Sequence, residues 1–231
     1  MRLAFRRTTF WFPRRWRTST FQRVATIYHG ERFNCASHLA GTVLAAAGAI
    51  VLVVAASAPG DPWKIVSFSI YGATLVLLYA FSTLYHCLRG SAKALFRRLD
   101  HSAIYMLIAG TYTPFALVTL RGDWGWPLFG AAWGMAVVGV AQELWTRSVR
   151  RILSLILYLL MGWMAVAVTL PLLAALGWTG FSWLVAGGVF YTGGILFYVY
   201  DEQWKHAHGI WHLFVLAGSA SHYGAILMFV A

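Results

Sequence analysis

Long apolar runs separated by short polar segments dominate the pattern of this chain. Seven runs reach or approach the length of about 20 apolar residues that a helix needs to cross a bilayer, and they occupy residues 38–58, 65–88, 102–120, 124–144, 152–171, 182–200 and 211–231. They lack the ten-residue polar and apolar alternation of a membrane β-barrel. The pattern therefore predicts an all-α membrane protein, a bundle of seven transmembrane helices.

The composition narrows the class of protein further. Of the 231 residues, 60% are hydrophobic and only 11% are charged, whereas a soluble domain carries about 25% charged residues. This excludes a soluble enzyme, a disordered regulator and a secreted disulfide scaffold. The two cysteines, Cys35 and Cys87, are predicted to be reduced and structural.

The basic residues indicate how the bundle is oriented. Sixteen of the 18 Lys and Arg residues lie before the first span or between spans 2–3, 4–5 and 6–7, and the other side has only Lys64 and Arg121. By the positive-inside rule, the N-terminus is cytoplasmic and the C-terminus is outside. Because the charge of +11 is gathered beside the spans, it indicates lipid headgroups as partners and no nucleic acid.

The chain divides into two parts. Residues 1–28 mix arginines with Phe and Trp, which predicts a juxtamembrane arm lying on anionic lipid. A disordered tail that only sets topology is the alternative. Residues 29–231 are predicted to form one multi-pass membrane domain.

Polar residues far apart in the sequence are predicted to lie at one membrane depth. His86 ends the second span, Asp100 starts the third, and His208 and His212 open the seventh. Within the spans, Glu143 near the cytoplasmic end of the fourth is the exceptional formal charge, which disfavours an ion-coupled transporter. The last span has no lysine for a retinal Schiff base.

The spacing of these residues suggests a metal site. His208 and His212 share one helix face, and His86 would complete a three-histidine set that leaves one position of a tetrahedral Zn²⁺ for water. Zinc would lower the pKa of that water to about 7. Asp100 is the candidate general base, and Ser82, one turn before His86, could stabilise developing charge. The alternatives are a hydrogen-bonded cluster that staples spans 2, 3 and 7, or Fe, Cu or Ni instead of zinc.

Other polar residues have less defined roles. Glu31, Asn34 and His38 share a face leading into the first span, where they could form a second shell, border a substrate or cap the helix. His222 lies about 15 Å from His212 by helical rise and is predicted to be a satisfied interior histidine. His101 follows Asp100 directly and therefore points off its face.

These residues also carry a family resemblance. The motifs are Glu31-x2-Asn34-x3-His38, Ser82-x3-His86, Asp100 before Ile104-x3-Ile108-x-Gly110-x-Tyr112-x-Pro114, and His208-x3-His212. As an ordered set from about residue 29 to the C-terminus, they resemble the hemolysin III branch of the progestin and adipoQ receptor family. The resemblance implies a seven-helix bundle with its N-terminus inside and a bacterial-type member of the plasma (inner) membrane. It also implies zinc held by His86, His208 and His212, with Asp100 reaching the zinc through water and Ser82 beside it.

Two functions of different classes follow as hypotheses. The first is a zinc-dependent hydrolase that cleaves a lipid amide or ester through a metal-bound water near the cytoplasmic face, with its lipid substrate entering the bundle from the bilayer. The wider superfamily implied by the resemblance includes alkaline ceramidases. The alternative is a hemolysin-like protein that perturbs membranes or forms a channel, with a structural zinc site. A ligand sensor without turnover is a third, less favoured hypothesis.

Overall fold

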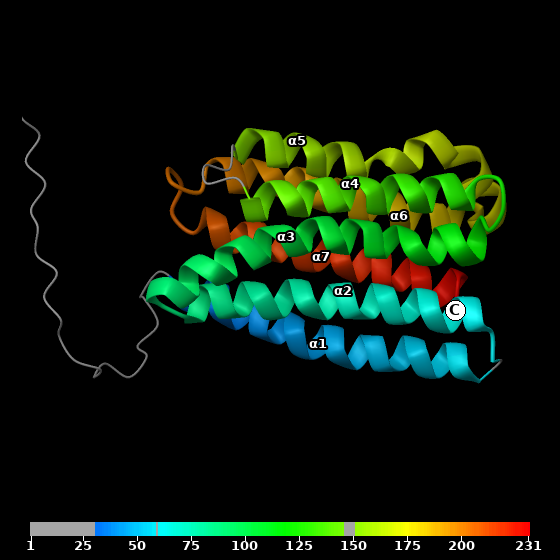
Figure 1. The fold of residues 1–231 in the computed structure, drawn as a ribbon, viewed down its shortest axis with the longest axis horizontal. Helices are drawn as coiled ribbons and strands as arrows, with labels where there is room; N and C mark the ends of the chain where they lie inside the picture. Colours follow the sequence, from blue (N-terminus) through cyan, green and yellow to red (C-terminus); the bar gives the residue numbers. More distant parts are fainter. Residues whose placement is uncertain (1–30, 59, 146–150) are drawn as a thin grey trace, which may run out of the picture.

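The structure is a computed structural model that describes residues 31–58, 60–145 and 151–231. Over these residues the chain forms α-helices and no strand, which confirms the all-α prediction. The helices are α1 (Arg32–Ser57), α2 (Pro62–Cys87), α3 (Gly90–Pro114), α4 (Gly125–Trp145), α5 (Arg151–Gly162), α6 (Thr169–Val199) and α7 (Ala207–Phe229). Figure 1 shows them side by side along one long axis. The predicted arm, 1–28, lies outside the described residues.

Six helical segments of the described chain are long and apolar enough to cross a membrane. One of them, Ile152–Val199, has 48 residues, and a straight helix of that length would be about 70 Å long, over twice the thickness of the hydrocarbon core. Gly177 interrupts this stretch with a φ of 65° and a ψ of 174°. In Figure 1 the chain runs to one end of the bundle in α5 and returns in α6. The seven-span count and the orientation of the termini stay predictions.

The third helix begins earlier than its apolar run. α3 starts at Gly90, whereas the predicted third span starts at residue 102. The difference arises because hydropathy detects only the apolar part of a helix. Its first turns carry Lys93, Arg97 and Arg98 and are largely exposed, so part of the predicted 2–3 loop is a polar extension of α3.

Small residues let neighbouring helices approach closely. A Cβ atom at Gly110 in α3 would overlap the Thr74 hydroxyl of α2, and one at Gly187 in α6 would overlap the His222 ring of α7. Both glycines therefore allow close contact between two helices. Gly188 has more room, because the nearest atom to its Cβ position is 3.5 Å away in Trp163.

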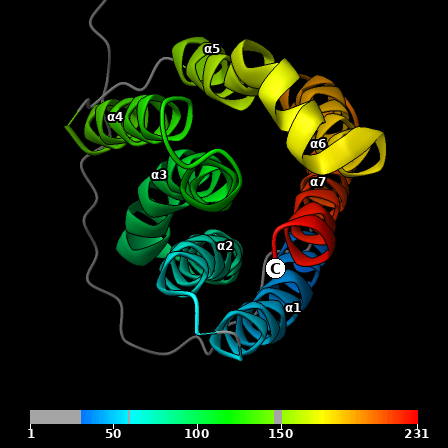
Figure 2. The same ribbon diagram turned by 90° about the vertical axis from the view of Figure 1, so that its right-hand side faces the viewer.

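The helices border a partly open cavity. Viewed end-on in Figure 2, α2 and α3 lie on one side of the bundle and α6 and α7 on the other. The cavity between them has a volume of about 650 Å³, and side chains such as Leu107, Ile108 and Leu184 line it. Its wall also includes polar residues at the end of the bundle where α2 ends and α3 and α7 begin. That end contains the predicted site.

Candidate metal centre

Three histidines from two helices converge at this end of the bundle. His86 lies in the last turn of α2, and His208 and His212 occupy successive turns at the start of α7. Each offers one ring nitrogen to a set of atoms that all lie within 4.8 Å of one another. His86 and His212 are buried, and His208 is half-buried. The predicted three-histidine set is thus brought together and could hold a metal.

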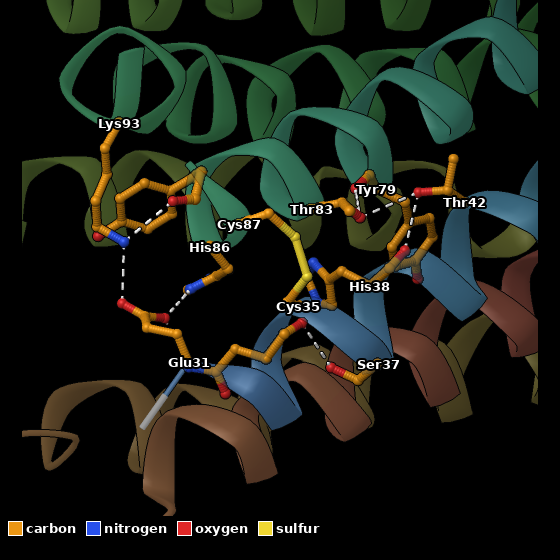
Figure 3. Close-up of a disulfide and its surroundings, with 12 residues drawn as sticks. Glu31, Cys35, Ser37, His38, Thr42, Tyr79, Thr83, His86, Cys87 and Lys93 are labelled. Atoms are coloured by element: carbon orange, nitrogen blue, oxygen red, sulfur yellow. Dashed lines mark hydrogen bonds and ion pairs between the residues drawn. A yellow bond between two sulfur atoms is a disulfide. The ribbon is translucent and has the colours of Figure 1, made fainter. Parts of the chain in front are cut away.

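A carboxylate orients the first of these rings. Glu31, just before α1, is in hydrogen-bond contact with His86 Nδ1, and its other oxygen accepts a hydrogen bond from Lys93 Nζ at 3.0 Å (Figure 3). Burial opposes ionisation of this carboxyl, but the bonds from His86 and Lys93 outweigh it and lower the pKa of Glu31 to about 2. The ionised carboxylate can only accept, so His86 Nδ1 carries the proton.

The other two rings have partners at the same nitrogen. His208 Nδ1 lies 3.0 Å from Asp201 Oδ2, and His212 Nδ1 lies 3.2 Å from Ser37 Oγ. Ser37 Oγ in turn donates to the Asn34 carbonyl at 3.1 Å. Because the hydroxyl proton is used there, Ser37 accepts from His212 Nδ1.

One consequence is common to all three imidazoles. A neutral ring that donates from Nδ1 has its lone pair at Nε2, the arrangement found where an outer carboxylate or hydroxyl holds a metal-binding histidine. His86 Nε2 is buried and has no hydrogen-bond partner among the described residues. Three neutral imidazole nitrogens suit Zn²⁺ and related borderline metals. The residues present therefore fit a metal ion.

Asp100 and Ser82 lie beside this cluster. The Ser82 side chain on α2 interacts with the Asp100 carboxylate on α3, which also interacts electrostatically with His86. Both residues line the cavity, together with His208 and His212. The structure thus places all five predicted site residues at one end of the bundle.

His38 belongs to the same region. Its ring centroid is 3.7 Å from that of His212, with the planes tilted by 32°, and it lines the cavity. Neither ring nitrogen has a hydrogen-bond partner among the described residues. Glu31, Asn34 and His38 had several possible roles from the sequence. In the structure His38 packs on His212, and Glu31 contacts His86.

The cysteines differ from the prediction. Cys35 and Cys87 form a disulfide that joins α1 to α2, with Cα atoms 5.7 Å apart, so the expectation of two reduced cysteines is wrong for this structure. The error arose because the expectation considered composition and compartment, whereas the antiparallel packing of the two helices places Cys35, near the start of α1, opposite Cys87 at the end of α2. Figure 3 shows the bond beside His86.

Two other histidines lie away from the metal cluster. His222 Nε2 is 3.1 Å from the Leu184 carbonyl, as expected of a satisfied interior histidine. His101 Nδ1 lies 3.6 Å from Glu143, and Ser154 Oγ donates to the same carboxylate at 2.6 Å. Glu143 is thereby a buried link between α3, α4 and α5 rather than a lone intramembrane charge.

Sequence reasoning did not identify Ser37 and Asp201. Ser37 lies on α1, a different helix from His212. Asp201 is seven residues before His208, but it lies in the connection before α7, so helical spacing pairs neither residue with its histidine. The only sequence feature that could have identified them is a polar residue in a segment next to a helix that carries a site histidine. It does not distinguish a histidine partner from an ordinary surface residue.

Comparison with known proteins agrees with the motifs. A family model described as Haemolysin-III related matches residues 26–223. The chain belongs to the haemolysin-III-related family. This confirms the resemblance that the ordered motifs suggested.

Several named proteins are similar to this chain over most of their length. The chain is 41% identical to Hemolysin-3 of Bacillus cereus, over 92% of this chain and 97% of the relative. It is 40% identical to a Hemolysin-3 homolog of Bacillus subtilis, over 86% and 93%. A human relative, Monocyte to macrophage differentiation factor, is 29% identical over 84% of this chain and 81% of its own. The family model and these relatives thus match most of the chain.

Proposed function

We propose that this protein is a zinc-dependent integral membrane hydrolase that cleaves a lipid amide or ester. The observation that carries the proposal is the set of three imidazoles with partnered Nδ1 atoms, next to a carboxylate on the wall of a largely apolar cavity. A histidine cluster that only joins helices by hydrogen bonds needs no such cavity. A purely structural metal site needs no neighbouring carboxylate on the cavity wall.

The residues would divide the chemistry as follows. His86, His208 and His212 would hold the ion, which when bound supplies a Lewis acid and lowers the pKa of water. Asp100 would take a proton from the attacking water and return it to the leaving group. Ser82, whose side chain interacts with the Asp100 carboxylate, would stabilise charge that develops beside it.

The cavity favours a lipid as the substrate. Its volume of about 650 Å³ lies within the range of small-molecule sites, about 300–1,000 Å³. Apolar side chains from α3 and α6, such as Ile108 and Leu184, would surround an acyl chain. The scissile carbonyl would then lie at the polar end, beside Asp100. With the predicted orientation, that end would lie on the cytoplasmic side of a bacterial inner membrane.

Hydrolysis by purified protein tests this function directly. Detergent-purified wild type with measured zinc content is given a panel of N-acyl lipid amides and lipid esters, and released fatty acid is quantified. Asp100→Asn should reduce turnover at least about 100-fold, the lower end of general-base contributions, while zinc is retained. Asp123→Asn, an exposed carboxylate at the opposite end of the bundle, is the matched control. Unchanged hydrolysis in Asp100→Asn would overturn the proposal.

The names of two relatives favour a second candidate function. Both bacillar proteins are called hemolysins, and a membrane-perturbing role predicts that purified protein releases dye from loaded liposomes. In that case the site would be a structural metal centre, and leakage would persist in Asp100→Asn. Dye leakage with both wild type and Asp100→Asn, and no fatty acid released by either of them, would favour this function over the hydrolase.

A further inference from the structure

Two links join the same pair of helix ends. The disulfide connects Cys35, near the start of α1, to Cys87, the last residue of α2. One helical turn before Cys35, Glu31 is in contact with His86, the neighbour of Cys87 (Figure 3). The covalent bond and the Glu31–His86 contact therefore hold the same junction.

This junction positions more than one site histidine. The start of α1 supplies Glu31 to His86 and Ser37 to His212, the latter at 3.2 Å. His38 lies against the ring of His212, with centroids 3.7 Å apart. A shift of the first two turns of α1 would consequently disturb two of the three imidazoles. The cysteine pair is the covalent constraint on that shift.

We propose that Cys35 and Cys87 form a reversible dithiol–disulfide couple that controls how tightly the histidine site holds its metal. The inference rests on the metal site of the proposed function, but not on the reaction performed there. In the oxidised form, α1 is fixed to α2 and its partners hold the rings. In the reduced form, the start of α1 is held by noncovalent contacts alone, and the site binds metal more weakly.

The different exposure of Cys35 and Cys87 determines which sulfur a reductant attacks first. Cys35 is buried, with 6% of its surface exposed, whereas Cys87 is half-buried at a helix end. A thiolate of a reducing dithiol attacks the Cys87 sulfur, forming a mixed disulfide and releasing Cys35 as a thiolate. The second thiol of the reductant then displaces Cys87. Two electrons and two protons pass to the protein, and the reductant becomes a disulfide.

The surroundings of the bond argue that both states occur. The first turns of α3, at the same end of the bundle, carry Lys93, Arg97 and Arg98, and the charge bias predicts that this end is cytoplasmic. Disulfides in a reducing compartment are transient rather than permanent. A bond placed there, one residue from a metal-site histidine, is suited to report the redox state of the cell to the site.

Zinc affinity measured in both redox states tests the proposal. Purified wild type is oxidised with diamide or reduced with a phosphine, the reagent is removed, and the zinc affinity of each form is measured by chelator competition. Reduction should weaken zinc binding about tenfold, the lower end of the effect of losing outer partners of metal-binding histidines. Cys35→Ser/Cys87→Ser is the matched control, which should bind zinc like reduced wild type and show no response to either reagent.

Hydrogen exchange provides a second readout that needs no metal. In metal-free protein, reduction should increase amide exchange over residues 31–38 and leave the far end of α1 unchanged. Failure of diamide to form the bond, or equal zinc affinity and equal exchange in both redox states, would overturn the inference. Absence of zinc from oxidised wild type would contradict the metal site instead, and the exchange measurement would still decide whether the bond controls α1.

Discussion

The hydrogen bonds of single imidazoles distinguish a metal site from a hydrogen-bonded staple. A staple would satisfy both nitrogens of a buried histidine within the protein, since an unpaired buried polar atom costs about 1–3 kcal/mol. Among the described residues, buried Nε2 of His86 instead has no partner, while Glu31 contacts its Nδ1. This pattern supports the metal site.

The outer partners of the histidines should differ in strength. Glu31→Gln replaces a charged acceptor of His86 with a neutral one, and we expect zinc affinity to fall about 10–100-fold. Ser37→Ala removes a neutral acceptor of His212, so its effect should be smaller, about 3–10-fold, because neutral hydrogen bonds contribute about 1 kcal/mol. Chelator competition measures both. Asp123→Asn should bind zinc like wild type, and an equal affinity in all three variants would contradict the assigned partners.

Single residues also show how far the sequence could lead. The i, i+4 spacing and the span boundaries were enough to bring His86, His208 and His212 to one depth. The partner Ser37 could not be predicted, because its contact with His212 crosses from α1 to α7 and depends on the rotation of each helix about its axis. Asp201 could not be predicted, because it lies in a connection whose conformation the hydropathy pattern does not define. The Cys35–Cys87 bond was missed because the expectation relied on composition and compartment rather than on how α1 packs against α2.

Among the helices, the α2–α3 pair is central because it carries Ser82, His86 and Asp100. Its close approach depends on Gly110, where a Cβ atom would overlap the Thr74 hydroxyl. Gly110→Ala should lower the free energy of unfolding by about 1–3 kcal/mol, as overpacking does. Thermal unfolding in detergent measures the change.

A second glycine provides the control for this substitution. Gly134 in α4 is exposed, and no atom of the described part of the chain lies within 4 Å of its Cβ position. Gly134→Ala should be neutral or slightly stabilising, because alanine favours a helix by up to about 1 kcal/mol. If both variants unfold alike, the close α2–α3 contact does not contribute as the structure indicates.

Helix boundaries were predicted less well than helix existence. Apolar runs located all the long helices, but the polar start of α3 at Gly90 carries no hydropathy signal. The stretch 172–181 was too apolar to mark a connection, and the structure interrupts the helix at Gly177 by backbone conformation rather than by polar residues.

At the scale of the whole molecule, the number of membrane crossings can be tested by labelling. Thr179, Asp123 and Lys205 are exposed, and each is replaced by cysteine in the Cys35→Ser/Cys87→Ser background. With seven spans and a cytoplasmic N-terminus, an impermeant maleimide should label positions 179 and 123 in intact cells and position 205 only after permeabilisation. Failure to label position 179 from either side would contradict two passes by α5 and α6.

The cavity makes a separate prediction about substrate length. Ile108 lines the cavity on α3, and Ile108→Trp would fill part of it without touching the histidines. Turnover of long-chain substrates should fall at least about tenfold relative to short-chain ones, while zinc content stays unchanged. Comparing substrates that differ only in acyl length measures this, and an equal loss for all lengths would argue against an acyl chain in the cavity.

The global architecture was the most predictable level. Hydropathy alone indicates a helical membrane bundle, because a bilayer requires every backbone polar group to be satisfied within the helix. The cavity could not be predicted, since it depends on how far α3 lies from α6 across the bundle. Its lining residues, such as Ile108 and Leu184, look like ordinary core residues in the sequence.

Metal content tests the central claim most directly. Elemental analysis compares detergent-purified wild type, kept oxidised and free of chelator, with His86→Ala, His208→Ala and His212→Ala, and with His222→Ala as a control histidine outside the site. We expect about one zinc per chain in wild type and the control, and its loss in the three site variants. Folded wild type without metal would contradict the metal site, and with it the proposed hydrolase.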